Sequence, residues 1–121
     1  MSNIYMYLLF LFIPFSVMAE SGERCQGDMT IHSNMVLCIQ GDTEKIEQKI
    51  KNDINKKGSD YDLNIDFYSL QRKYISEKCG IYNMLGGGGQ RAELLENQCE
   101  LDGVSDLYKF IKIYMTAVDN N

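Results

Sequence analysis

Four cysteines, at positions 25, 38, 79 and 99, are the residues whose type and spacing point most directly to chemistry. A structural zinc site uses Cys or His residues in closely spaced pairs, but these cysteines are scattered and His32 is the only histidine. In a small exported chain, four cysteines instead indicate two disulfide bonds. The pattern therefore predicts covalent cross-links and no metal site.

Catalysis has little support among the other reactive residues. A nucleophile needs a neighbouring base, and the chain has a single histidine, while cysteines held in disulfides cannot act as nucleophiles. The carboxylate pairs Asp60/Asp62 and Glu93/Glu96 fit solvated helix faces and helix starts better than a buried acid–base pair. The sequence predicts that the protein is not an enzyme.

Four consecutive glycines, Gly86 to Gly89, lie between Cys79 and Cys99. A phosphate-binding loop would need a strand before the glycines and a Lys-Ser/Thr pair after them, whereas Gln90-Arg91 follows here. Because glycine reaches backbone angles closed to other residues, the run is predicted to form a flexible connection. No cofactor is expected.

Arg91 opens the helix that is predicted to follow the glycines, where the helix dipole disfavours a cation. Most exposed charges are simply solvated, and the alternative for Arg91 is a residue kept to meet a carboxylate on a partner. The net charge of −5 argues against nucleic acid and suits a cationic protein partner, although it is also an ordinary charge for solubility. The candidate binding residues are Gly86, Gly87, Gly88, Gly89, Gln90 and Arg91.

The elements that must position these residues begin after an export signal. Residues 1–19 contain no Asp, Glu, Lys or Arg and end in Val17-Met18-Ala19, which predicts a signal peptide cut before Glu20. A membrane anchor would need roughly 20 apolar residues, more than this interrupted run provides. Residues 20–121 are therefore predicted to form a single domain, periplasmic or secreted, with no membrane attachment after cleavage.

Hydrophobic periodicity predicts an all-α fold. Ile46, Ile50 and Ile54 recur every four residues with charged residues between them, as on one face of a helix. Alternation from Tyr61 to Phe67 also resembles a strand, but no second strand is apparent to pair with it, so we expect a helix there. The predicted helices cover about 28–40 and 43–56, bent or broken at Gly41, then about 59–79, 91–101, and a last segment from Ser105 after a break at Asp102-Gly103.

A small helical bundle built on an antiparallel helical hairpin follows from these segments, with two disulfides as staples. Positions 38 and 79 are equidistant from the turn signals at Gly58-Ser59, so the two cysteines should lie at the same height in the hairpin. Four cysteines allow three connectivities. This level-matching favours Cys38–Cys79, which leaves Cys25–Cys99.

The cysteine layout resembles the LprI-like lysozyme-inhibitor family of small exported bacterial proteins. The matching features are Cys25, Met35-x-x-Cys38, Tyr74 five residues before Cys79, Gly88-Gly89 between Cys79 and Cys99, and an amphipathic helix after Cys99. The chain departs from the family pattern at three places. Ile75-Ser76 replace an Arg-Asp pair, Gln71 replaces a tryptophan, and Leu107 lies near an expected arginine.

The resemblance implies a periplasmic inhibitor that binds a cationic, lysozyme-type peptidoglycan hydrolase and blocks its cleft, with Gly80 to Arg91 making the contact. An alternative is an immunity protein against a peptidoglycan amidase delivered by type VI secretion, because the segment from Cys99 through Ser105-x-Leu107 to Tyr114 is loosely similar to that group. A third hypothesis is a structural or interaction protein of the envelope that has no enzyme target.

Overall fold

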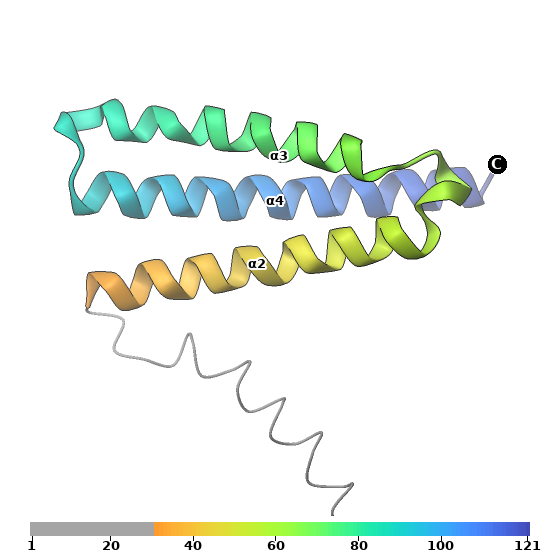
Figure 1. Cartoon of the computed structure of the whole chain (residues 1–121), viewed down its shortest axis with the longest axis horizontal. Coiled ribbons are helices and arrows are strands. Elements are labelled where there is room, and N and C mark those ends of the chain that lie inside the picture. Colours follow the sequence, from red (N-terminus) through yellow and green to blue (C-terminus); the bar gives the residue numbers. More distant parts are fainter. Residues whose placement is uncertain (1–30) are drawn as a thin grey trace, which may run out of the picture.

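The computed structural model describes residues 31–121, which form three helices joined by two short 3-10 segments (Figure 1). The elements are α2 (His32–Lys57), η1 (Gly58–Tyr61), α3 (Ile65–Cys79), η2 (Gly80–Gly87) and α4 (Gln90–Asp119). The predicted all-α class is confirmed. The predicted signal peptide and Cys25 lie outside the described residues.

Helix α4 lies between α2 and α3 (Figure 1). The chain runs along α2, returns along α3 and then follows α4 in the direction of α2. Both outer helices pack mainly on α4 and touch each other much less. The predicted hairpin of α2 and α3 is therefore present in chain order, but α4 is the element that holds it together. No helix between residues 31 and 121 is long and apolar enough to cross a membrane.

The core forms from one apolar stripe on each helix. Ile50 and Ile54 are buried, as their spacing predicts, and Ile46 packs against the core at its margin. Burying a side chain of this size contributes roughly 1.5 to 3 kcal/mol. The buried residues that form the cluster are Ile50, Ile54, Tyr68, Ile75, Cys79, Val104, Leu107, Ile111 and Met115.

Two glycines that were predicted to break helices lie inside them. Helix α2 continues through Gly41, which is buried, and α4 continues through Gly103. A Cβ atom at Gly103 would lie 2.7 Å from Cγ2 of Ile75, so the missing side chain allows α3 to approach α4 closely. Glycine has a weak helix propensity, which is why both positions were predicted to interrupt a helix. Tertiary packing overrides that propensity here.

Helix α3 begins later than predicted. The helix was expected to start at about residue 59, where Ser59-x-x-Asp62 has the spacing of a capping box, but this segment falls in the turn and Asp62 adopts a left-handed conformation with φ 57°. The N-cap is Asn64, whose side chain accepts a hydrogen bond from the Phe67 amide at 3.0 Å. An Asn at this position satisfies one of the unpaired amides of the first turn, so the helix starts at Ile65.

The predicted disulfide pairing is wrong. Cys79 bonds to Cys99, which excludes both Cys38–Cys79 and Cys25–Cys99, and Cys38 is itself disulfide-bonded. The level-matching failed because residues 58–64, which include the 3-10 segment η1, do not belong to α3. Roughly 28 Å of helix separate Cys38 from the end of α2, but only about 21 Å separate Cys79 from the start of α3. Helix α4, not α2, lies beside Cys79.

Candidate functional site

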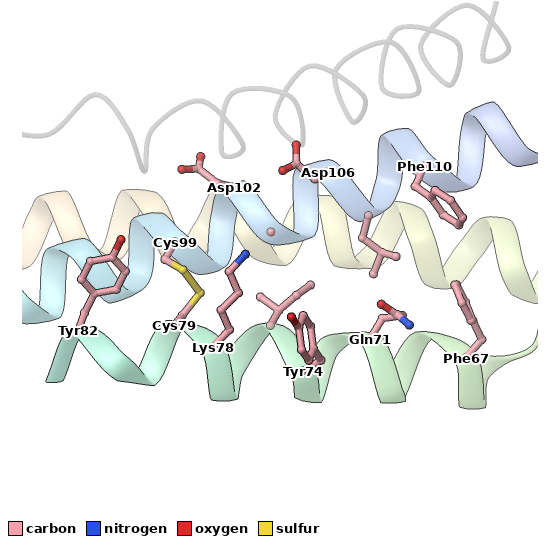
Figure 2. A pocket seen from close by; sticks show the side chains of 13 residues that line it. Phe67, Gln71, Tyr74, Lys78, Cys79, Tyr82, Cys99, Asp102, Asp106 and Phe110 are labelled. Carbon is pink, nitrogen blue, oxygen red and sulfur yellow. A yellow bond between two sulfur atoms is a disulfide. The ribbon is translucent and has the colours of Figure 1, made fainter. Parts of the chain in front are cut away.

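A groove of about 590 Å³ runs between α3 and α4 (Figure 2). It is an open depression in the surface, with one wall on each helix and one end at η2. The side chains that project into it or form its rims are Phe67, Gln71, Tyr74 and Lys78 from α3, Tyr82 from η2, and Asp102, Asp106 and Phe110 from α4. Volumes of several hundred Å³ accommodate a few side chains of a partner.

The floor of the groove is held rigidly. The Cys79–Cys99 disulfide joins the two walls with a Cα–Cα distance of 5.6 Å, and Ile75 packs over Gly103 further along. A cross-link that closes a loop of this length stabilises the folded state by about 3 kcal/mol in the chain-entropy estimate. The groove is therefore preformed.

Two aromatic side chains on the rims are exposed. Tyr74 is 63% exposed and Phe110 is 57% exposed, although each follows the spacing of the apolar residues along its helix, which is typical of a core position. On α3, the buried stripe passes through Ile75, and on α4 it passes through Leu107 and Ile111. Tyr74 and Phe110 each lie one position beside their stripe, so they face solvent across the groove (Figure 2).

Three charged side chains line the same groove. Asp102 and Asp106 are one turn apart on α4, and Lys78 from α3 extends toward α4 (Figure 2). Asp102 accepts a hydrogen bond from the Gln98 side-chain amide at 3.0 Å. None of the three forms an ion pair with another residue in the range 31–121. The groove thus carries two negative charges and one positive charge, all available to a partner.

A polar network next to the groove joins all three helices. The Tyr68 hydroxyl donates to Glu47 of α2 at 2.7 Å, and Arg72 lies 3.5 Å from Glu47 and 3.0 Å from Glu100 of α4. Burial and then the hydrogen bond to Glu47 raise the pKa of Tyr68. Burial lowers the pKa of Arg72, but the hydrogen bond to Glu100 and the charge of Glu47 outweigh it and raise the pKa overall. These paired groups hold the bundle together.

The predicted binding residues lie at one end of the bundle. Gly86 and Gly87 belong to η2, so half of the glycine run is more regular than expected. Gly88 and Gly89 have φ of 90° and 102°, which favours glycine, and Gly89 caps α4. Gln90 and Arg91 follow as the first residues of α4; both are exposed.

The structure places these six residues at the same end of the bundle, and Gly88, Gly89, Gln90 and Arg91 do not line the groove. Arg91 forms no ion pair with any residue that the structure describes. Two apolar side chains of η2 are exposed at the same end, Ile81 at 61% and Met84 at 82%. A binding role for this end stays a prediction.

The carboxylate pairs make structural contacts or face solvent. Glu93 lies 3.1 Å from Nε2 of His32, and Glu96 accepts a hydrogen bond from the Asn83 amide. Asp60 and Asp62 are exposed in the turn region before α3. Among residues 31–121, no group of three or more His, Cys, Asp or Glu side chains is placed to hold a metal ion.

Comparison with known proteins assigns the family. The family model of antitoxin TsiV3 matches residues 29–120. An antitoxin protein TsiV3 from Vibrio cholerae serotype O1 is 40% identical over 119 residues, which is 98% of this chain and 96% of the relative. The chain belongs to the TsiV3 antitoxin family.

Membership of the TsiV3 antitoxin family overturns the LprI-like assignment. That resemblance was based on the spacing of cysteines and of Gly88-Gly89. The spacing of a few cysteines and glycines is weaker evidence of a family than 40% identity along nearly the whole chain. The departures at Gln71, Ile75-Ser76 and Leu107 are consistent with this correction.

The lysozyme-inhibitor function predicted first is likewise replaced. The TsiV3 family is one of antitoxins, which supports the alternative immunity function and agrees with the prediction that the chain is not an enzyme. An antitoxin acts on a toxin, so the expectation of a protein partner also holds at this coarser level.

The charged residues of the groove in this TsiV3-family chain were not predicted from the sequence. Asp102 and Asp106 are spaced by one helical turn, a signal that the sequence contains. Because Asp102-Gly103 was predicted to be a helix break, the two aspartates were not expected to share one helix. Lys78 and Tyr82 gave no signal of their own, since only the packing of α3 on α4 places them opposite the two aspartates.

Proposed function

We propose that this chain is an antitoxin that neutralises a protein toxin by binding to it directly. The observation that carries the proposal is the 40% identity to a V. cholerae antitoxin over 98% of the chain. Identity at this level along nearly the whole length favours a shared mode of action. Neutralisation by binding needs no catalytic group, which fits the paired carboxylates and disulfide-bonded cysteines described above.

The periplasm is the proposed place of action. The predicted signal peptide at residues 1–19 would export the chain, and disulfides are stable in that oxidising compartment. A toxin neutralised there would attack the envelope, and peptidoglycan is its prominent polymer. The immunity protein against a type VI secreted peptidoglycan amidase is the specific form of this proposal.

A protection assay tests the proposal. The toxin partner, to be sought first among the genes next to the one for this chain, is directed to the periplasm of a sensitive host, with the full chain or with a variant that lacks residues 2–19. Because the two proteins must meet in the periplasm, the full chain should restore growth, and the variant that stays in the cytoplasm should not.

An unrelated periplasmic toxin provides the control, since an antitoxin should not protect against it. Purified toxin and purified chain lacking the leader should also form a complex with the disulfides intact. Absence of both protection and complex formation would contradict the proposed function.

A further inference from the structure

We propose that the groove between α3 and α4 is the surface that docks the toxin, and that it receives a basic segment of that protein. In the docked complex, Lys or Arg side chains of the segment lie against Asp102 and Asp106. Apolar side chains beside them pack on Tyr74 and Phe110. This inference rests on the proposed antitoxin function and goes beyond it by assigning the surface and the chemistry of its occupant.

Preorganisation is the first argument. The Cys79–Cys99 disulfide and the close contact of Ile75 with Gly103 fix the two walls before any partner arrives. Binding to a rigid surface avoids much of the entropy cost of ordering side chains and loops. By contrast, the bundle end presents Met84, an 82% exposed flexible side chain, beside a glycine connection.

The aromatic rims are the second argument. Tyr74 and Phe110 are more than half exposed, while Phe67 and Tyr82 are partly buried at the groove ends. Aromatic side chains are enriched among the residues that dominate binding energy in protein interfaces, because they bury a large area at low cost in side-chain entropy. Exposed aromatics on both sides of a preformed groove fit a docking surface.

Charge determines the occupant. Asp102 and Asp106 project from one face of α4 and form no ion pair with the described part of the chain. The whole chain carries a net charge of −5, so its field also attracts cations. Complementary charge steers association and disfavours wrong partners. Lys78 lies on the opposite wall and restricts the basic side chains to the α4 side.

A second copy of this chain fits the groove less well. A symmetric dimer centred on the groove would place the same patch of both copies together. Each copy would bring a groove with two aspartates and one lysine, so two patches of net negative charge would meet, which is unfavourable. A basic segment of the toxin meets the same aromatic rims without this repulsion.

The test measures binding of the purified toxin from the protection assay to the disulfide-bonded chain and its variants. Tyr74→Ala/Phe110→Ala should weaken Kd at least about 30-fold, since such residues act as interface hot spots. Asp102→Asn/Asp106→Asn should lower the association rate and make it less sensitive to salt. All four side chains are exposed, so the fold should tolerate both double substitutions. Thermal melts monitored by circular dichroism check that each variant is folded.

Two matched control variants distinguish an effect of the groove from a general effect of charge or of exposed apolar area. Asp60→Asn/Asp62→Asn changes the net charge equally at exposed positions outside the groove, and Asn tolerates the left-handed backbone at position 62. Leu37→Ala removes an apolar side chain of α2 that is 59% exposed. Neither should alter Kd by more than about twofold.

The outcomes separate the two proposals. A wild-type chain that fails to bind the toxin overturns the proposed function, and the groove assignment falls with it. If the wild type binds but both groove variants bind equally well, the groove assignment is wrong while the antitoxin function stands. If the groove variants bind the toxin as the wild type does but lose self-association, measured by sedimentation, the groove binds a second copy of this chain. That result would also overturn the inference.

Discussion

The two sides of α4 differ in how they are held and in what they leave exposed. Toward α2, the polar contacts are side-chain pairs near the surface, such as Lys112 with Asp53 at 3.0 Å and Gln40 with Asn97 at 3.1 Å. Toward α3, a disulfide and a contact over Gly103 bring the backbones close, and a groove with exposed aromatics lies along the same contact. A rigid contact on one side of a helix thus creates a surface that a partner can use.

The largest expected effect comes from removing the cross-link on the α3 side. Cys79→Ala/Cys99→Ala should lower the free energy of unfolding by about 3 kcal/mol, because the unfolded chain regains the entropy of an open loop. Urea denaturation at neutral pH measures the change. Peptide mapping of the wild type under non-reducing conditions should recover a peptide with Cys79 joined to Cys99. Recovery of Cys79 joined to Cys38 would contradict the structure.

A steric change at the same contact should cost somewhat less. Gly103→Leu places a side chain where a Cβ would already lie 2.7 Å from Ile75, and such overpacking should destabilise the fold by about 1 to 3 kcal/mol. Gly80→Ala is the matched control, since a Cβ there meets nothing within 4 Å and φ is −60°. Thermal melts of both variants measure the difference. Equal melting temperatures for the two would disprove the close approach of α3 to α4.

The network that joins both sides gives an intermediate, pH-dependent effect. Tyr68→Phe should cost about 1 kcal/mol at pH 7, because Glu47 loses a hydrogen-bond donor. Burial, with the Glu47 hydrogen bond, raises the pKa of Tyr68 above its ordinary value of about 10. The unfolded tyrosine therefore ionises first, and the stability due to this raised pKa is present below pH 10 and lost as the pH rises above it.

The measurement is urea denaturation of wild type and Tyr68→Phe from pH 7 to pH 11. The wild-type free energy of unfolding should fall more steeply above pH 10 than that of the variant, so the gap between them narrows. Parallel curves over this range would show that Tyr68 ionises equally in the folded and unfolded chain.

The smallest effect is expected on the α2 side. Lys112→Met removes the ion pair with Asp53, in which the lysine side chain is 44% exposed. The aspartate side chain is 23% exposed, so water and salt partly screen the pair and the loss should be about 1 kcal/mol or less. Thermal melts at low and high salt measure it. A loss of unfolding free energy as large as that of Cys79→Ala/Cys99→Ala would show that the two sides of α4 do not differ in this way.

Local patterns predicted much of the fold. The spacing of Ile46, Ile50 and Ile54 correctly placed the buried face of α2, because helical periodicity is a property of neighbouring residues. Helix ends were predicted less well, as Asn64 rather than the Ser59 box caps α3. Both errors at Gly41 and Gly103 arose from propensity, which packing between helices overrides.

The candidate site was harder to predict than the fold. The glycine run Gly86 to Gly89 was predicted to be a flexible connection, although η2 includes its first half. The groove was not identified, since it exists only where α3 meets α4. Tyr74 and Phe110 fit a core spacing when each helix is considered alone, and only the neighbouring helix decides that they stay exposed.

The amino-acid sequence by itself determined that this chain is helical and disulfide-bonded, and its identity to a known antitoxin determined its family. These follow from residue type and from spacing within a turn or two. The tertiary structure decided that Cys79 pairs with Cys99 and that two aspartates and two aromatics share one groove. The reason is physical: such contacts depend on which helix packs beside α3, and that choice rests on the burial of the whole core rather than on any one segment.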